Sequence, residues 1–235
     1  MPRCRCRICA PAGKRPDRVN LDLFDAPGDA QPATEALADG AMLLRDLARP
    51  MQDELLADVR AVIAMAPLRQ FVTPGGLRMS VEMTNCGTLG WVSDRRGYRY
   101  TANDPERGAS WPAMPPSFAR LAAQAAVQAG FGGFAPDACL INRYRPGTKL
   151  SLHQDRDEHD LEAPIVSVSL GLPATFLFGG EKRADKAQRL RLRHGDVVVW
   201  GGPSRLRFHG VLPLAEGEHA LLGAQRINLT FRRAG

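Results

Sequence analysis

The run IVSVSLGLPATFLF, residues 165–178, decides the fold class of this 235-residue chain. Two short apolar segments suited to buried strands are separated by Gly-Leu-Pro, which ends one strand and begins a turn. Short strands and tight turns of this kind recur through about the last hundred residues. The strands predicted there are 138–144, 165–170, 175–178, 189–193, 196–200, 207–212 and 226–232. Seven or eight short strands in so small a region predict a β-sandwich, a jelly roll or a barrel.

The chain before residue 137 has a different periodicity. Apolar residues at helical spacing predict amphipathic helices at 51–65 and 116–129. Short strands are predicted at 41–44 and 79–84. Residues 85–114 are rich in glycine, asparagine, proline and aromatic residues. So long a connection within one domain is typical of a lid or a binding loop, and we expect one here.

Most of the net charge of +6 lies at the start of the chain. Residues 1–20 hold six basic residues against Asp17, so the chain from Leu21 onward carries only about +1. The segment 1–20 also contains prolines and lacks apolar periodicity, which predicts disorder. A basic charge that belongs to a tail does not indicate a nucleic-acid-binding body.

The five cysteines indicate a reducing compartment, because their number is odd and their spacing fits no disulfide framework. Cys4, Cys6 and Cys9 could bind a soft metal ion, although a fourth ligand is missing and the spacing matches no known zinc motif. No apolar run is long enough to span a membrane, and the N-terminus lacks the apolar segment of a secretory signal. We therefore predict a cytoplasmic protein.

The stretch LSLHQD, residues 150–155, is the first candidate for chemistry. On extended chain, His153 and Asp155 point to the same side, while Gln154 points away. An imidazole and a carboxylate that converge in this way supply two ligands of the two-His, one-carboxylate site of non-haem Fe(II) oxygenases. The motif is short, and the charged residues 156–160 also fit a solvated polar loop.

The chain offers four candidates for the third ligand: His159, His194, His209 and His219. His159 lies in the charged loop, and His219 lies in an expected surface loop. His194 sits in a glycine turn, where a capping role is expected. His209 lies inside a predicted strand, where it is either a core residue or a ligand, and we choose it as the ligand.

Two predicted strands are polar on one face. The strand 226–232 places Arg226, Asn228, Thr230 and Arg232 on one side and apolar residues on the other. In the strand 138–144, Leu140, Asn142 and Tyr144 share one face. Each face is either the solvent side of a half-exposed strand or the lining of a pocket inside the fold. In a pocket, two arginines on one strand would suit a dicarboxylate, because guanidinium binds carboxylate with two hydrogen bonds.

This order of motifs resembles the AlkB family of Fe(II)- and 2-oxoglutarate-dependent dioxygenases. The similarity runs from about Leu21 to the C-terminus, with the tail before Leu21 and the non-aromatic Ile227 as departures. The blocks that carry it are MSVEMTNCGTLGW (79–91), PDACLINRY (136–144), LSLHQD (150–155), APIVSVSLGLP (163–173), HGDVVVWGG (194–202) and NLTFR (228–232).

The resemblance implies a mostly β fold with flanking helices, built on a double-stranded β-helix (jelly-roll) core. It divides the chain into the tail (1–20), an N-terminal extension with a nucleotide-recognition lid (21–114) and the dioxygenase core (115–235). It implies that His153, Asp155 and His209 bind Fe(II), with 2-oxoglutarate and O2 as cosubstrates. The residues implied for 2-oxoglutarate are Asn142, Tyr144, Arg226, Asn228 and Arg232.

The implied reaction is oxidative demethylation of N-methylated bases such as 1-methyladenine and 3-methylcytosine. DNA, single- or double-stranded, is the expected partner of a monomeric enzyme. The residues implied for the damaged base are Trp91, Tyr98, Asp157 and Arg183. Two alternatives stay open: a different substrate such as RNA, a protein or a small molecule, and a non-catalytic nucleic-acid-binding module with a dead metal site.

Overall fold

The structure is a computed structural model that describes residue 1 and residues 34–235. Apart from residue 1, the predicted tail and its three cysteines lie outside the described residues. The helices are α1 (Gln52–Met65) and α2 (Pro116–Gln128), with the 3-10 turns η1 (Arg49–Met51) and η2 (Gly202–Ser204). The strands are β1 (Thr34–Ala38), β2 (Ala41–Leu44), β3 (Glu82–Gly87), β4 (Gly90–Asp94), β5 (Gly97–Thr101), β6 (Ala138–Tyr144), β7 (Leu150–His153), β8 (Ile165–Gly171), β9 (Ala174–Phe178), β10 (Gln188–Leu192), β11 (Val197–Trp200), β12 (His209–Val211) and β13 (Arg226–Arg232).

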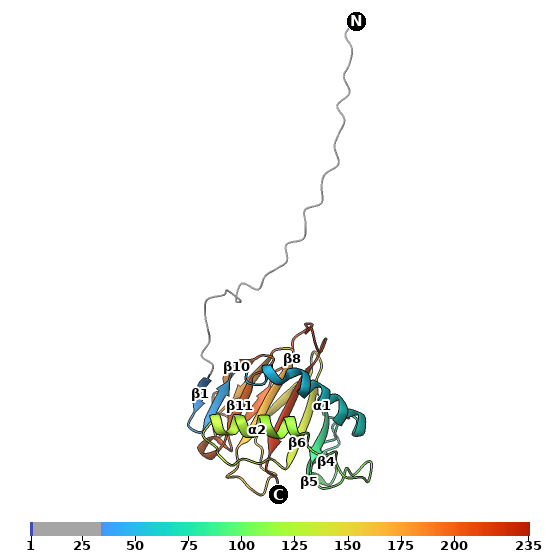
Figure 1. The fold of residues 1–235 in the computed structure, drawn as a ribbon, viewed down its shortest axis with the longest axis vertical. Coiled ribbons are helices and arrows are strands. Elements are labelled where there is room, and N and C mark those ends of the chain that lie inside the picture. Colours follow the sequence, from blue (N-terminus) through green and yellow to red (C-terminus); the bar gives the residue numbers. More distant parts are fainter. Residues whose placement is uncertain (2–33) are drawn as a thin grey trace. The chain divides into compact units, whose positions relative to one another are not determined.

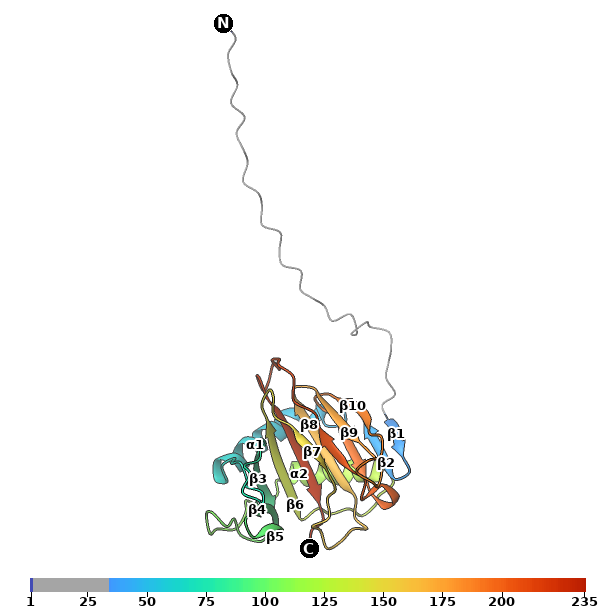
Figure 2. The same cartoon turned by 180° about the vertical axis from the view of Figure 1, so that it is seen from behind.

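Two antiparallel sheets form the core of the fold. The major sheet has the order β1-β2-β11-β8-β13-β6-β3, and the minor sheet has the order β10-β9-β12-β7. Seen from one side, α1 and α2 lie across the major sheet, and from behind the strands β7, β9 and β10 are in view (Figures 1 and 2). This arrangement is the predicted jelly roll with flanking helices.

The alternation of side chains on β13 explains both layers of the core. Ile227, Leu229 and Phe231 pack with residues of α1 and α2 in one apolar cluster. Arg226 and Arg232 have the opposite parity and point between the sheets, into the space that the second cluster surrounds. Every residue of β13 is buried. The half-exposed alternative for this strand is therefore excluded, and its polar face lines the interior.

The residues predicted as an N-terminal extension and lid contribute strands and a helix to the core. β1, β2 and β3 join the major sheet, and α1 packs on it. Residues 85–114, predicted as a long loop, instead contain the end of β3 and the separate β4-β5 hairpin. The two-residue turn of this hairpin is followed by Gly97 at φ 114°, a conformation that glycine adopts readily. Among the described residues, no helix is long and apolar enough to cross a membrane.

Candidate active site

Two histidines and one carboxylate meet at the end of the minor sheet. His209 on β12 is the register partner of His153 on β7, and their ring centroids are 4.4 Å apart. The Oδ1 atom of Asp155 lies 3.5 Å from His153 Nε2 and 3.8 Å from His209 Nε2. One ligand atom from each residue lies within 4.8 Å of the others, so the three could hold a metal ion. This is the trio predicted from the sequence.

The backbone orients both imidazole rings toward this common point. His153 Nδ1 donates to Ser151 O at 2.9 Å, and His209 Nδ1 donates to Arg207 O at 3.0 Å. Each carbonyl can only accept, so the proton sits on Nδ1 and the Nε2 lone pair is free for a metal ion. In both cases the acceptor lies two residues before the histidine, which the extended strand geometry permits.

The electrostatic surroundings of His209 and Asp155 favour the protonation states that a metal ion requires, whereas the pKa of His153 is raised because the hydrogen bond and charge of Asp155 outweigh its burial. Burial, reinforced by the neighbouring His153, lowers the pKa of His209 to about 4. Burial alone would raise the pKa of Asp155, but the charge of Arg232 outweighs it and holds that pKa well below its usual range. His209 is therefore neutral and Asp155 ionised at neutral pH, as metal ligands must be.

A buried network of charges holds Asp155 in place. Arg232 Nη2 donates to Asp155 Oδ2 at 2.7 Å, and Arg205 Nη1 donates to the Asp155 carbonyl at 2.9 Å. Glu158 bridges the two arginines, with Arg205 Nη2 at 3.0 Å and Arg232 Nε at 3.2 Å. Tyr100 on β5 donates to Glu158 Oε1 at 2.6 Å, so the hairpin is tied to the same network.

Sequence reasoning misses three members of this network: Tyr100, Glu158 and Arg205. The sequence pattern places Glu158 in a solvated charge run, yet its side chain is only 2% exposed. Burial raises the pKa of Tyr100 well above its usual value, so its hydroxyl stays protonated and can donate. No periodicity in the sequence marks these positions, because their burial depends on how the hairpin packs on residues 155–158.

Arg226 is the most unusual group in the interior. It is 1% exposed, and its Nη2 donates to Ser169 Oγ at 2.9 Å. Its Nε and Nη1 atoms are buried without a hydrogen-bond partner among the described residues. Its guanidinium carbon lies 5.0 Å from the ring centroid of Tyr144, its register partner. A buried cation with two unused donors is costly unless an anion completes it, so the site fits a carboxylate ligand.

The other residues predicted for the cosubstrate line the same interior face. Asn228 pairs in register with Asn142, and the two side-chain amides are 3.5 Å apart. Asn228 Nδ2 donates to Ser167 Oγ at 2.8 Å, and Thr230 Oγ1 donates to Asn228 Oδ1 at 2.9 Å. Arg232 differs from Arg226, because its donors already face Asp155 and Glu158. The strand face thus runs from an unpaired arginine to one that supports the ligand cluster.

Three of the four residues predicted for a base lie together. The rings of Trp91 and Tyr98 stack across the β4-β5 hairpin, with centroids 5.7 Å apart and planes 12° apart. Trp91 Nε1 donates to Asp157 Oδ2 at 2.7 Å. Arg183 lies instead in the connection between β9 and β10, with its guanidinium carbon 5.9 Å from the centroid of Phe208. Among the described contacts, none joins Arg183 to the other three.

The remaining histidine candidates lie outside the cluster. His194 Nδ1 accepts from the Gly171 amide at 2.9 Å, and its Nε2 is 2.8 Å from Gln52 Oε1 at the start of α1. Its ring stacks on His219 with a centroid distance of 4.5 Å. The metal-binding cluster found among the described residues includes neither of them, nor His159.

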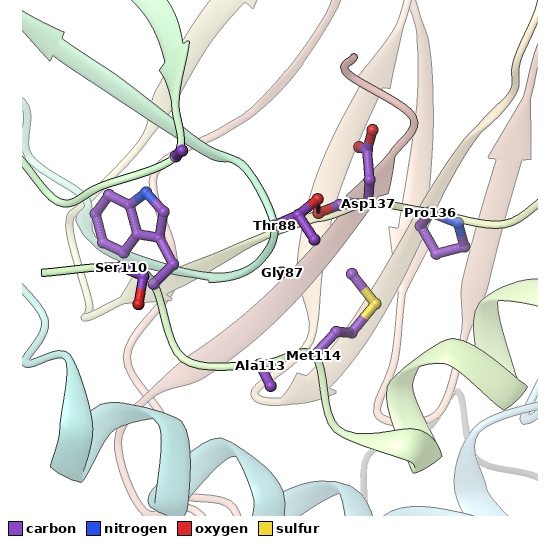
Figure 3. A pocket seen from close by; sticks show the side chains of 9 residues that line it. Gly87, Thr88, Ser110, Ala113, Met114, Pro136 and Asp137 are labelled. Carbon is purple, nitrogen blue, oxygen red and sulfur yellow. Dashed lines mark hydrogen bonds between the residues drawn. The ribbon is translucent and has the colours of Figure 1, made fainter.

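Neither of two surface pockets is lined by the three clustered residues. One, of about 460 Å³, lies between the end of β3 and the segment before α2, and Figure 3 shows Met114, Pro136 and Asp137 at its wall. The other, of about 500 Å³, is lined by Gln154, Arg205 and neighbouring residues. Its floor therefore includes part of the network behind Asp155.

Fold and site together define a class of protein. A jelly roll with two histidines and one carboxylate at the end of one sheet is the scaffold of non-haem Fe(II) oxygenases. Inside the same jelly roll, the two donor atoms of Arg226 that have no partner among the described residues could bind an acidic cosubstrate.

Comparisons with known proteins agree with this class. A model of the 2OG-Fe(II) oxygenase superfamily matches residues 40–232. The chain is 59% identical over 215 residues to the alpha-ketoglutarate-dependent dioxygenase AlkB of Escherichia coli (strain K12), covering 92% of this chain and 98% of that protein. It is 37% identical over 134 residues to the nucleic acid dioxygenase ALKBH1 of Mus musculus, covering 55% of this chain and 34% of that protein. A solved structure described as "The structure of OsALKBH1" matches with a TM-score of 0.73 and 30% identity, covering 85% of this chain and 99% of that one.

The chain therefore belongs to the 2OG-Fe(II) oxygenase superfamily. It is a dioxygenase that depends on Fe(II), 2-oxoglutarate and O2. The predicted fold class, enzyme class and cofactors are confirmed.

Proposed function

We propose that this dioxygenase repairs alkylated DNA by oxidative demethylation of N-methylated bases such as 1-methyladenine and 3-methylcytosine. The observation that carries the proposal is the combination of the His153, Asp155 and His209 cluster with the unpaired cation of Arg226 in one interior. Its similarity to relatives named AlkB and nucleic acid dioxygenase supports the substrate class.

In this proposal, the three clustered residues hold Fe(II). Bound Fe(II) with 2-oxoglutarate and O2 supplies the oxidation that hydroxylates the N-methyl group. The hydroxymethyl group then leaves the base as formaldehyde, while the cosubstrate ends as succinate and CO2. Other groups of the chain hold the three metal-binding side chains in place. Arg232 and Arg205 fix Asp155, and two backbone carbonyls fix the histidine rings.

Arg226 binds the distal carboxylate of 2-oxoglutarate through the Nε and Nη1 donors that have no other partner among the described residues. Tyr144, beside it in the β6-β13 register, adds a hydroxyl donor at the same end. Asn142, Asn228 and Arg232 lie on the same face of β6 and β13 and would contact the rest of the cosubstrate. The register pairs of β6 and β13 set these polar groups at successive positions along the pocket.

Trp91, Tyr98 and Asp157, which lie together, form the base-binding side of the site, and Arg183 from the connection between β9 and β10 adds a further contact to the nucleotide. A base must leave the helical stack to reach an interior metal, and a methyl group on its pairing edge lowers the cost of leaving. Each stacking contact with an aromatic ring contributes ~1–3 kcal/mol. The methylated bases named above carry positive charge, which suits an aromatic face beside the Asp157 carboxylate.

The test is formaldehyde release from a single-stranded oligonucleotide with one 1-methyladenine, supplied with Fe(II), 2-oxoglutarate and O2. We expect release that requires all three, and omission of each is the control. If succinate forms without formaldehyde, the substrate is RNA or protein rather than DNA. If iron is bound and neither product forms, the protein is a non-catalytic binding module. A DNA substrate, a monomeric state and a cytoplasmic location remain predictions of the sequence.

A further inference from the structure

A strongly basic surface lies beside the site, and apart from Arg183 its residues have no role in the proposed chemistry. Residues 182–193 contain six basic residues and one acidic residue, Asp185, a net charge of +5. The chain from Leu21 onward carries only about +1, so the rest of it is net acidic. We call this surface the β10 basic face; its members are Lys182, Arg183, Lys186, Arg189, Arg191 and Arg193.

The alternation of β10 explains why the face points outward. Leu190 and Leu192 pack into the apolar cluster between the sheets. Arg189 and Arg191 have the opposite parity, and both are exposed. Their register partners on β9 are Leu177 and Thr175, so two cations stand about 6.6 Å apart on the outer side of the minor sheet.

Three of these cations lack the partners that other arginines in the fold have. Arg45, Arg69 and Arg143 each face a carboxylate at 2.5–2.7 Å. No ion pair within residues 34–235 includes Lys186, Arg189 or Arg191. Uncompensated charges of one sign along a strand raise the local potential and attract a polyanion.

The face begins in line with the metal-binding cluster. Gln188, Phe178, His209 and His153 form one register row across β10, β9, β12 and β7. The start of β10 is therefore two strand spacings, about 10 Å, from His209. Arg183 lies in the connection that joins β9 to β10 at this end. From that connection the basic side chains continue along β10 and away from the site.

We propose that the β10 basic face binds backbone phosphates of the nucleic acid on one side of the modified nucleotide. This inference rests on the proposed function, because the bound strand is the one whose base enters the site. Continuity with that site favours nucleic acid over an anionic lipid surface. The contacts are sequence-independent, since phosphates carry no base information. They extend the binding site beyond the few nucleotides that the base pocket can hold.

The test compares Arg189→Gln/Arg191→Gln with the unchanged protein on a methylated trinucleotide and on a single strand of about twenty nucleotides. Fluorescence anisotropy with the long strand, across a range of salt concentrations, measures affinity without turnover. Each phosphate contact contributes ~0.7 to the salt slope of a single strand, so the double variant should lose about 1.4. Its affinity for the long strand should fall on the order of tenfold at 0.1 M salt. Turnover of the trinucleotide should stay within about twofold.

The charge control is Arg60→Gln/Arg120→Gln, which removes the same number of positive charges from exposed positions on α1 and α2; of these, Arg120 is paired with Glu54. An equal loss in this control would mean that net charge alone matters and would overturn the inference. An unchanged salt slope in the double variant would overturn it too. The inference would also be overturned if the Arg189→Gln/Arg191→Gln variant lost binding to phosphatidylserine vesicles but still bound the oligonucleotide as the unchanged protein does. Failure of the proposed function is seen separately, as absence of formaldehyde from the unchanged protein.

Discussion

Replacing Arg226 should have opposite effects on cosubstrate binding and on the stability of the ligand-free protein. The side chain is 1% exposed, and two of its donor atoms have no partner among the described residues. Burial lowers the pKa of Arg226, which means that its charge is poorly solvated where it lies. Arg226→Met removes this charge and retains most of the packing against Tyr144.

The expected magnitudes follow from the hydrogen bonds that change. A hydrogen bond to a charged group contributes ~1.5–3 kcal/mol, so losing two of them weakens 2-oxoglutarate binding by about 3–6 kcal/mol. Because 1.4 kcal/mol is tenfold, the KM for 2-oxoglutarate should rise by at least roughly a hundredfold. Arg226→Lys keeps the charge without the planar fork, and its KM should rise only about ten- to a hundredfold. Without ligand, Arg226→Met should be more stable by ~1–2 kcal/mol, since a half-paired buried charge is gone.

Two measurements check this reasoning. Succinate formation at varied 2-oxoglutarate gives the KM of each variant, and urea unfolding of the metal-free protein gives the free energy of unfolding. Tyr144→Phe is the matched control, because it keeps the ring beside Arg226 and removes only the hydroxyl. The interpretation is wrong if Arg226→Met leaves the KM within about threefold, or if it destabilises the ligand-free protein by more than ~2 kcal/mol.

The remaining predictions concern the metal cluster, its supporting network, the base site and the tail. His209→Ala should abolish iron binding and turnover, whereas His194→Ala should keep a loaded site; iron content of the purified variants decides between them. Glu158→Gln removes the carboxylate that pairs with the buried guanidinium groups of Arg205 and Arg232. Urea unfolding should therefore report a free energy of unfolding lower by ~3–5 kcal/mol. Trp91→Ala removes one stacking surface worth ~1–3 kcal/mol, so kcat/KM on a 1-methyladenine oligonucleotide should fall about ten- to a hundredfold, and an unchanged value would remove Trp91 from the base site. Deleting residues 1–20 should leave formaldehyde release intact at equal iron loading, and loss of turnover would show a role for the tail.

Sequence patterns locate most of the core elements, because the apolar residues that recur at strand or helix spacing are also the ones that are buried. The strands predicted at 138–144 and 226–232 have the same bounds in the structure, and the helix predicted at 116–129 ends one residue earlier, at Gln128. Patterns fail where apolar alternation is weak. They do not predict β1, they begin β3 at residue 79 rather than at Glu82, and they predict a loop in place of the β4-β5 hairpin. Polar and glycine-rich strands of this kind depend on their neighbours rather than on their own sequence.

The His153 and Asp155 pair is a local property of the chain, but the choice of His209 among four candidate histidines is not. The His-x-Asp motif converges on any extended segment, and the polar parity of residues 226–232 follows from the period of a strand, so the sequence by itself determines both. Tertiary packing alone decides that these groups share one interior. His209 meets His153 because β12 pairs with β7 in that register, across a connection of more than fifty residues. Glu158 is buried rather than solvated because Tyr100, from a distant hairpin, and two arginines converge on it. Burial and pairing of a charge depend on all the elements around it, and no single stretch of sequence contains that information.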